Sequence, residues 1–344
     1  MTSIDAICDH SKALTKYCSS NGRNFILTLA IAASGLNIWN TAALAQTDYP
    51  SRVIRVIVPL PPGPIFDTVP RLIGDKLSSK WGQPVVIENR PGAGSTIGAD
   101  AVARAEGDGY TLLATPPAPL VIAPHFYPSL SYVAAKFVPV SVVAKVPTAL
   151  VVNPKVPASS FPELVAYAKA NPGKLSYGSP GLGQTPQLAM VKLMAAAGIE
   201  FLHVPYQGMA PAARDLLAGH VDIMIDNVGN VMEHIKAGRL KLIAITSDAR
   251  LPQFPDVPTV AETLPGVTHT DWLAVVAPQK TPSAIATKLS QAISDTLKLP
   301  DVAERLEILH LTAVGSTPAE AAEMIAQESE RWRQVIVAAG LKAQ

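Results

Sequence analysis

The sequence offers few combinations of residue types that could carry out catalysis. It contains no H-E-x-x-H zinc motif and no P-loop, and Tyr177 precedes Ser179 where a G-x-S-x-G nucleophile turn requires glycine. The seven histidines are scattered, with no two at the spacing typical of metal ligands. We therefore expect no catalytic residue, no metal site and no cofactor.

One glycine-rich segment, GAGSTIG at 92–98, follows a predicted strand and precedes a predicted helix. Its spacing, G-x-G-x-x-x-G, is one residue longer than the dinucleotide-binding motif. Two interpretations remain open at this point: a tight turn between strand and helix, or a phosphate-binding loop.

Loops that follow predicted strands are more informative. They are PPGPIFD at 61–67, GSPGLGQT at 178–185, YQGMAP at 206–211 and the pair Asp226-Asn227. Amide groups at helix N-termini carry partial positive charge and suit a carboxylate. Each loop alone could serve only tight turning and stiffness, but together they favour an anion-binding cleft.

Composition excludes other classes of protein. The 344 residues include 28 basic and 27 acidic side chains, so the net charge of +1 attracts neither nucleic acid nor an anionic membrane. A hydrophobic content of 48% with 16% charged residues indicates a folded globular protein. The 31 prolines are about twice the ordinary share.

Residues 1–45 resemble a secretory signal peptide. Arg23 precedes a short apolar run over 25–36, and Ala43-Leu-Ala45 fits the cleavage motif. We expect cleavage after Ala45 and a soluble periplasmic protein without cysteine, because Cys8 and Cys18 lie in the removed part. The alternatives are an uncleaved N-terminal anchor or a buried core helix.

The remaining chain alternates apolar strands with amphipathic helices, which predicts an α/β fold with mainly parallel sheets. We expect a helix over 69–80 and a long β segment over 138–152. Capping boxes at Ser160 and Thr317 and the pair Thr281-Pro282 predict three helix starts. Two α/β runs suggest two lobes, 46–146 with 247–344 and 147–246, and a ligand cleft between them.

The chain also resembles a known family, the substrate-binding proteins of tripartite tricarboxylate transporters, or Bug receptors. The segments that carry the resemblance follow one another in family order along the mature chain. They include YPSRVIRVIVP (49–59), GQPVVIENRPGAG (82–94), DGYTL (108–112), ANPGK (170–174), HVPY (203–206), LLAG (216–219) and PDVPTVAE (255–262).

This resemblance implies a two-lobed fold similar to type II periplasmic binding proteins, in which each lobe is a doubly wound, mainly parallel sheet. It also implies a receptor, not an enzyme, that binds a small organic carboxylate and delivers it to the membrane subunits of a transporter. No cofactor, metal or nucleic acid is implied, and we expect a monomer. The alternatives are an orphan or signalling receptor of the same fold, or a secreted α/β hydrolase.

The sequence departs from the family pattern at the first loop. Pro64 stands where the family usually has a second glycine, so one amide donor is missing. Ile65 and Phe66 replace small or polar residues, while Gln187 and Gln207 replace a frequent histidine and lysine. We therefore expect a ligand with fewer charges, such as an aromatic or longer-chain monocarboxylate; the alternative is an altered or impaired pocket.

Fourteen residues form the predicted ligand site. Two of them have two interpretations: Asp67 either caps the first helix or touches the ligand, and Asp226 either pairs across the cleft or ends its strand. The set is Gly63, Pro64, Ile65, Phe66, Asp67, Thr115, Pro180, Gly181, Gln184, Gly208, Met209, Ala210, Asp226 and Asn227.

Overall fold

The computed structural model describes residues 49–342, and the predicted signal peptide lies outside the described residues. From Pro50 onward the chain forms one compact unit. Its strands are β1 (Ile54–Val58), β2 (Val85–Asn89), β3 (Thr111–Thr115), β4 (Val138–Val152), β5 (Ser176–Ser179), β6 (Leu202–Pro205), β7 (Ile223–Asn227), β8 (Lys241–Ile245), β9 (Thr270–Ala277) and β10 (Thr312–Ala313).

The helices lie between these strands and at the carboxyl end. They are α2 (Ile65–Trp81), α3 (Thr96–Ala103), α4 (Ala123–Phe126), α5 (Phe161–Ala170), α6 (Thr185–Ala197), α7 (Met209–Ala218), α8 (Val228–Lys236), α9 (Ser283–Leu297), α10 (Pro300–Ile308) and α11 (Pro318–Ala338). Short helical turns cover Ala93–Ser95, Ala118–Ile122, Ala134–Lys136 and Val260–Glu262.

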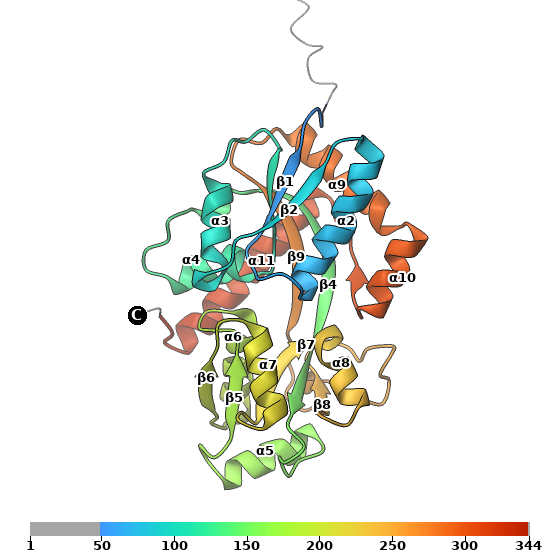
Figure 1. The fold of residues 1–344 in the computed structure, drawn as a ribbon. Helices are drawn as coiled ribbons and strands as arrows, with labels where there is room; N and C mark the ends of the chain where they lie inside the picture. Colours follow the sequence, from blue (N-terminus) through green and yellow to red (C-terminus); the bar gives the residue numbers. More distant parts are fainter. Residues whose placement is uncertain (1–48, 343–344) are drawn as a thin grey trace, which may run out of the picture. The chain divides into compact units, whose positions relative to one another are not determined.

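One strand, β4, joins two halves of the sheet. The strand order is β2-β1-β3-β9-β4-β7-β5-β6, with β8 and β10 also paired to β4 (Figure 1). The first part of β4 pairs antiparallel with β9, and its second part, from Thr148, pairs antiparallel with β7 and β8. Almost every side chain of β4 is buried, and its β-branched residues suit a strand packed on both faces.

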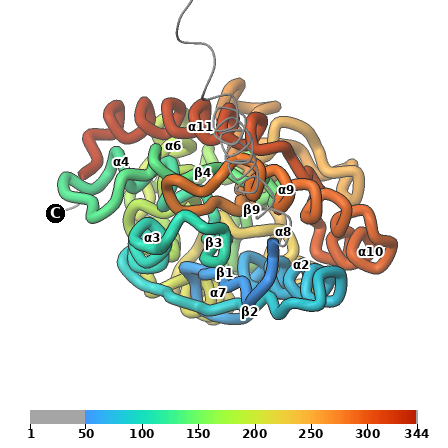
Figure 2. The backbone as a smooth tube through the Cα atoms, turned by 90° about the horizontal axis from the view of Figure 1, so that it is seen from above, coloured from blue at the N-terminus to red at the C-terminus, as the bar shows by residue number. Residues whose placement is uncertain are grey.

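We call the half containing β1, β2, β3, β9 and β10 the first lobe, and the half containing β5 to β8 the second lobe. In the first lobe β1 runs parallel to β2 and β3, and in the second β5 runs parallel to β6 and β7. Figure 2 shows α11 on the opposite side of the central strands from α2 and α3. This arrangement confirms the predicted two-lobed α/β fold; the residue boundaries of the lobes stay a prediction.

Both predicted capping boxes begin helices. Ser160 accepts a hydrogen bond from the Glu163 amide before α5, and Thr317 and Glu320 cap each other's backbone before α11. Thr281 does not cap α9, because its hydroxyl donates to the Pro278 carbonyl instead and leaves Pro282 as the N-cap residue.

The first long helix begins earlier than predicted. We expected 69–80, with Pro70 in its first turn, but α2 starts at Ile65 and continues through Pro70. Pro64 has φ of −63°, which suits a helix start, and its carbonyl accepts from the amides of Asp67 and Thr68. These hydrogen bonds make the turn before Pro70 helical, although Pro70 itself has no amide hydrogen to donate.

The glycine-rich segment is a tight turn between β2 and α3. Four consecutive residues, Gly92 to Ser95, have positive φ, from 45° to 126°. Further on, a Cβ atom on Gly98 would lie 2.8 Å from Pro59 Cβ and 3.0 Å from the Arg90 carbonyl oxygen. Glycine at 98 thus allows α3 to pack closely on β1, which favours the turn over a phosphate-binding loop.

Candidate functional site

Helices α2, α6, α7 and α8 begin at the carboxyl ends of parallel strands, where ligands bind in α/β folds. The α2 start follows β1 in the first lobe, and the other three starts follow β5, β6 and β7 in the second. The first turn of a helix leaves backbone amides without intrahelical partners. These four first turns are therefore the donors that the fold offers to an anion.

The lobes touch each other near these helix starts. A Cβ atom on Gly229, in the first turn of α8, would lie 2.6 Å from the Leu309 carbonyl oxygen and 3.0 Å from Ile65 Cδ1. At a second place, a Cβ atom on Gly94 would lie 3.1 Å from Gln184 Nε2. Two predicted site residues thus contact the opposite lobe: Ile65 lies against α8, and Gln184 lies against the turn at Gly94.

The carboxylate of Asp67 holds the first loop in place. It accepts from the Gly63 amide at 2.9 Å, from Asn89 Nδ2 at 2.8 Å and from Arg71 at 2.9 and 3.0 Å. Burial opposes the charge, but the hydrogen bonds from Arg71, Asn89 and Gly63 outweigh it and lower the pKa of Asp67. Asp67 is the third residue of α2 and Pro64 is the N-cap residue, so Asp67 does not cap the helix as one interpretation had it; its carboxylate holds the loop before the helix instead.

Two apolar side chains follow this loop. Ile65 and Phe66 are buried, with 4% and 6% of their surface exposed, and their amides are the first two of α2. The preceding residue, Pro64, contributes no amide hydrogen. The first-lobe donors are thus the amides of Ile65 and Phe66, beside apolar side chains.

The glycine amides of the second-lobe loops are used within the loops. Gly181 donates to Ser179 Oγ at 3.2 Å, Gly183 to Gln187 Oε1 at 3.3 Å, and Gly208 to the Pro180 carbonyl at 3.3 Å. We expected Gly181 and Gly208 to bind a ligand, but these amides donate to atoms of the second-lobe loops themselves. The donors left for a ligand are the first-turn amides of α6 and α7, the latter at Met209 and Ala210.

Ser179 and His203 form a pair that the sequence did not reveal. Ser179 Oγ lies 2.6 Å from His203 Nε2, and the imidazole stacks on Tyr177 with 4.6 Å between ring centroids. Burial lowers the pKa of His203. Ser179 is completely buried at the end of β5, so its hydroxyl is not presented to a substrate and instead anchors the loop through Gly181.

Asp226 and Asn227 end β7 and begin α8. Asp226 Oδ1 accepts from the Asn227 amide at 2.7 Å and from Asn230 Nδ2 at 3.0 Å. Burial raises the pKa of Asp226 to about 7. These partners favour the interpretation in which Asp226 ends its strand. Thr115, at the end of β3, is also fully buried and donates to the Pro116 carbonyl.

Sequence reasoning missed Arg71 and Asn89, which position Asp67. Asn89 ends β2 as Asn227 ends β7, and a polar residue at the carboxyl end of a strand that leads into a helix is the signal that could have found it. Arg71 has a weaker signal, since it lies four residues after Asp67 and therefore on the same helix face.

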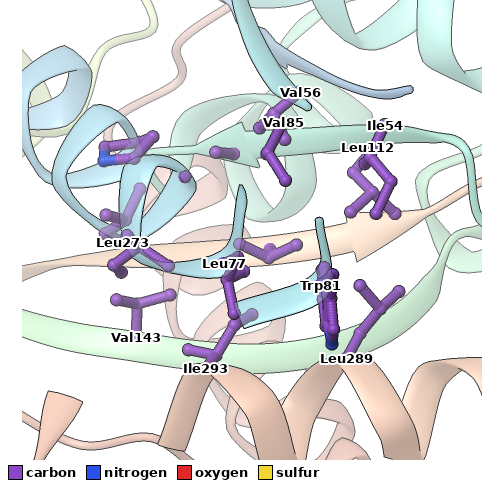
Figure 3. A pocket seen from close by; sticks show the side chains of 15 residues that line it. Ile54, Val56, Leu77, Trp81, Val85, Leu112, Val143, Leu273, Leu289 and Ile293 are labelled. Atoms are coloured by element: carbon purple, nitrogen blue, oxygen red, sulfur yellow. The ribbon is translucent and has the colours of Figure 1, made fainter. Parts of the chain in front are cut away.

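Two hollows lie in the first lobe, away from the predicted site. One holds about 30 Å³ between the sheet, α2 and α9, with apolar walls that include Leu77, Trp81 and Ile293 (Figure 3). It is far smaller than the 300–1,000 Å³ or so of ordinary ligand pockets. The other, of about 470 Å³, is lined by Arg104 and Lys136 among others. Neither contains a predicted ligand-binding residue.

Within residues 49–342, no group of three or more histidine, cysteine, aspartate or glutamate side chains could hold a metal ion. No helix in that range is long and apolar enough to cross a membrane.

Comparison with known proteins links this architecture to one family. The family model described as tripartite tricarboxylate transporter family receptor matches residues 69–341. Protein BugT of Bordetella pertussis is 38% identical over 92% of this chain and 97% of its own length. An R. palustris protein solved with adipate is 34% identical, with a TM-score of 0.81 over 86% of this chain and 99% of that one. The periplasmic binding protein BugD is 33% identical, with a TM-score of 0.79 over 86% and 100% of the two chains.

Proposed function

Because the chain belongs to the tripartite tricarboxylate transporter receptor family, we propose that it captures a small organic carboxylate between its lobes and delivers it to the membrane subunits of such a transporter. The family is one of solute-binding receptors, not of enzymes. The related R. palustris protein was solved with the dicarboxylate adipate. We further propose that this chain is exported to the periplasm, is cleaved after Ala45 and acts as a monomer.

The observation that best supports this proposal is the meeting of helix first turns from the two lobes. The start of α2 carries the Ile65 and Phe66 amides, and the Ile65 side chain lies against the first turn of α8, which belongs to the second lobe. A carboxylate bound there would receive donors from one lobe while the other closes over it. Binding would thereby stabilise the closed arrangement.

We also propose that the ligand has few charges and an apolar part. Pro64 removes one donor from the α2 start, and the buried Ile65 and Phe66 offer an apolar wall beside the remaining two. In the second lobe, Asp226 already occupies the start of α8, where a second ligand carboxylate would otherwise bind. An aromatic or longer-chain monocarboxylate satisfies these conditions better than citrate.

A thermal-shift screen followed by calorimetric titration tests both parts of the proposal. The compounds are benzoate, hexanoate, adipate, malate and citrate, with the uncharged amide benzamide as a control. A ligand at a hundred times its Kd stabilises the folded state by about 2.7 kcal/mol, which gives a measurable rise in melting temperature. We expect benzoate or hexanoate to raise it most and benzamide to have no effect.

Two results would contradict these expectations. If no carboxylate shifted the melting temperature, the receptor function itself would be wrong for this chain. If citrate bound more tightly than every monocarboxylate, the receptor function would stand but the proposed ligand class would not.

A further inference from the structure

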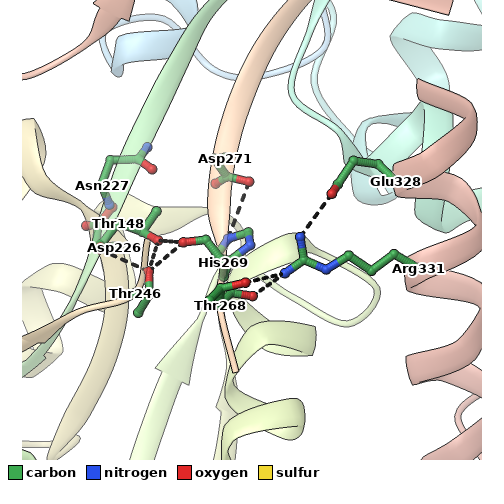
Figure 4. Close-up of polar contacts among 9 residues, drawn as sticks. All are labelled: Thr148, Asp226, Asn227, Thr246, Thr268, His269, Asp271, Glu328 and Arg331. Carbon is green, nitrogen blue, oxygen red and sulfur yellow. Dashed lines mark hydrogen bonds and ion pairs between the residues drawn. The ribbon is translucent and has the colours of Figure 1, made fainter. Parts of the chain in front are cut away.

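Three titratable side chains outside the proposed carboxylate contacts are buried where β4, β7 and β9 meet. Asp226, His269 and Asp271 have 2%, 4% and 2% of their surface exposed. Asp226 lies opposite Ala149 on β4, and Asp271 lies opposite Val146, so both flank the point at which β4 passes from one lobe to the other. Figure 4 shows the cluster at this crossing.

Two polar atoms of the cluster lack a hydrogen bond. Asp271 Oδ1 lies 3.5 Å from His269 Nε2, and neither atom has another partner within the described part of the chain. The hydroxyl of Thr185 lies close enough to Asp271 to lower the pKa of its carboxyl group, although burial outweighs this effect. No lysine or arginine among residues 49–342 forms an ion pair with Asp226 or Asp271. A buried carboxylate without a counter-ion is costly, so these groups favour their neutral form.

The charged groups around the cluster also favour the neutral forms of Asp271 and His269. Besides burial, Asp226 and Glu328 of α11 raise the pKa of Asp271, which reaches about 7. Burial, Arg331 of α11 and Lys192 of α6 lower the pKa of His269 to about 3. Arg331 is itself bound to Glu328 at 3.0 Å and to the Thr268 carbonyl, so it does not compensate Asp271.

We propose that Asp226 and Asp271 form a proton-binding site at the crossing between the lobes, occupied when the lobes close and emptied when they open. A proton on Asp271 Oδ1 would point at His269 Nε2, which is neutral and can accept it, and would so satisfy both unpartnered atoms. The proton comes from solvent and returns to it, and no covalent bond of the protein changes.

Lobe opening exposes this site because its covering elements come from both lobes. Asp271 belongs to β9, which runs into the first-lobe sheet, while the nearby Thr185 begins α6 of the second lobe. Rotation about the crossing separates these two elements and admits water. Hydrated carboxyl groups then return toward their ordinary pKa near 4 and lose their protons at neutral pH.

This inference rests on the proposed function and adds a pH dependence to it. Because the closed state holds protons that the open state loses, closure and ligand binding weaken as pH rises from about 4 to about 7. The loss is at most about tenfold in affinity per pH unit for each carboxyl group. Above about 7 both states are ionised and affinity no longer changes.

The first test needs no ligand. Melting temperatures of the full chain are measured from pH 5 to 9 for the original protein, Asp271→Asn and Asp226→Asn, with the exposed Asp248→Asn as the control. Asparagine mimics the protonated acid, so both buried variants should gain stability over the original protein as pH rises to about 7, and the gain should then stay constant. Asp248→Asn should track the original protein throughout. Gains that are independent of pH in both buried variants, without ligand and also with saturating adipate, would overturn the proposal.

The second test measures proton uptake on binding, with adipate and benzoate as probes. Calorimetry at pH 6.5 in buffers of different ionisation enthalpy should show protons taken up with the ligand, and fewer in each asparagine variant. Equal uptake in all variants would overturn the proposal. If neither probe bound at any pH, the receptor function would fail for these ligands, and the melting temperatures would still decide the proton site.

Discussion

At the scale of single residues, Pro64 limits the number of donors that the first lobe can present. It occupies the N-cap position of α2, where any other residue would add an amide hydrogen. We predict that Pro64→Gly binds adipate about tenfold more tightly, because a hydrogen bond to a charged group contributes about 1.5–3 kcal/mol, offset by some loss of loop stiffness. Calorimetric titration measures the change.

Pro62→Gly is the matched control for this substitution. Pro62 is exposed in the same loop but does not cap the helix, so its replacement loosens the loop without adding a donor at α2. If Pro62→Gly increased adipate affinity as much as Pro64→Gly, flexibility and not the restored amide would explain the gain.

Asp67 holds the first loop through four hydrogen bonds to its buried carboxylate. Replacing it with alanine leaves the Gly63 amide, Asn89 and Arg71 without this acceptor. We predict that Asp67→Ala lowers the free energy of unfolding by about 2–3 kcal/mol at pH 7, as measured by urea denaturation. Asp75→Ala, on the exposed face of the same helix, should change it by less than about 0.5 kcal/mol.

The Asp67 carboxylate also makes the stability of the protein depend on pH in a defined direction. Since folding lowers the pKa of Asp67 from its ordinary value of 3.8, its contribution is present above that pH and is lost as pH falls through the lower folded value. The difference in stability between the original protein and Asp67→Ala should therefore shrink below pH 4. A difference that stayed constant to pH 2.5 would show that the carboxylate charge does not matter.

At the scale of elements, local sequence signals predicted most of the fold. The run 138–152 is β4 to the residue, because continuous burial and β-branched side chains mark it, and the capping boxes at Ser160 and Thr317 begin α5 and α11. The start of α2 was missed because Asn89, distant in sequence, helps to hold the turn before Pro70 through Asp67.

The candidate site was less predictable than the fold. The loops were placed correctly at strand ends, yet the sequence could not show that the amides of Gly181, Gly183 and Gly208 donate hydrogen bonds to neighbouring atoms. Nor could it show that Asp226 and Asp271, 45 positions apart, would be buried at one crossing. Such pairings depend on how β4 aligns its neighbours, which no local pattern encodes.

The contact between α8 and the first lobe depends on a glycine. Gly229 lies within α8, so alanine suits its backbone, but the added Cβ would meet the Leu309 carbonyl oxygen and Ile65. We predict that Gly229→Ala lowers the melting temperature and weakens adipate binding by about fivefold or more, since the added methyl group overpacks the contact between the lobes and overpacking costs about 1–3 kcal/mol. Titration calorimetry and melting temperature together separate the two effects.

Glu233→Ala serves as the control on the same helix, because Glu233 is exposed and its ion pair with Lys236 stays within α8. It should leave adipate affinity unchanged. An unchanged affinity in Gly229→Ala as well would show that lobe closure does not require the contact between α8, Ile65 and Leu309.

At the scale of the whole molecule, β4 links the stabilities of the two lobes. Its first part belongs to the first-lobe sheet and its second part to the second-lobe sheet, without a break in the strand. A buried apolar cluster also spans both lobes, since it includes Leu113 and Trp332 of the first and Leu188 and Ile223 of the second. The lobes share a strand and a core, so one should not unfold while the other persists.

Leu216→Ala tests this coupling. Leu216 is a residue of α7 that is fully buried in a separate apolar cluster of the second lobe, and its truncation should cost about 3 kcal/mol. Among residues 49–342 the tryptophans, at 81, 272 and 332, all belong to first-lobe elements, so in a Trp39→Phe background their fluorescence reports chiefly on the first lobe. We predict that Leu216→Ala lowers the urea midpoint equally by tryptophan fluorescence and by far-UV circular dichroism. If the fluorescence midpoint stayed in place while the dichroism midpoint fell, the lobes would unfold independently, and β4 would connect them without coupling their stabilities.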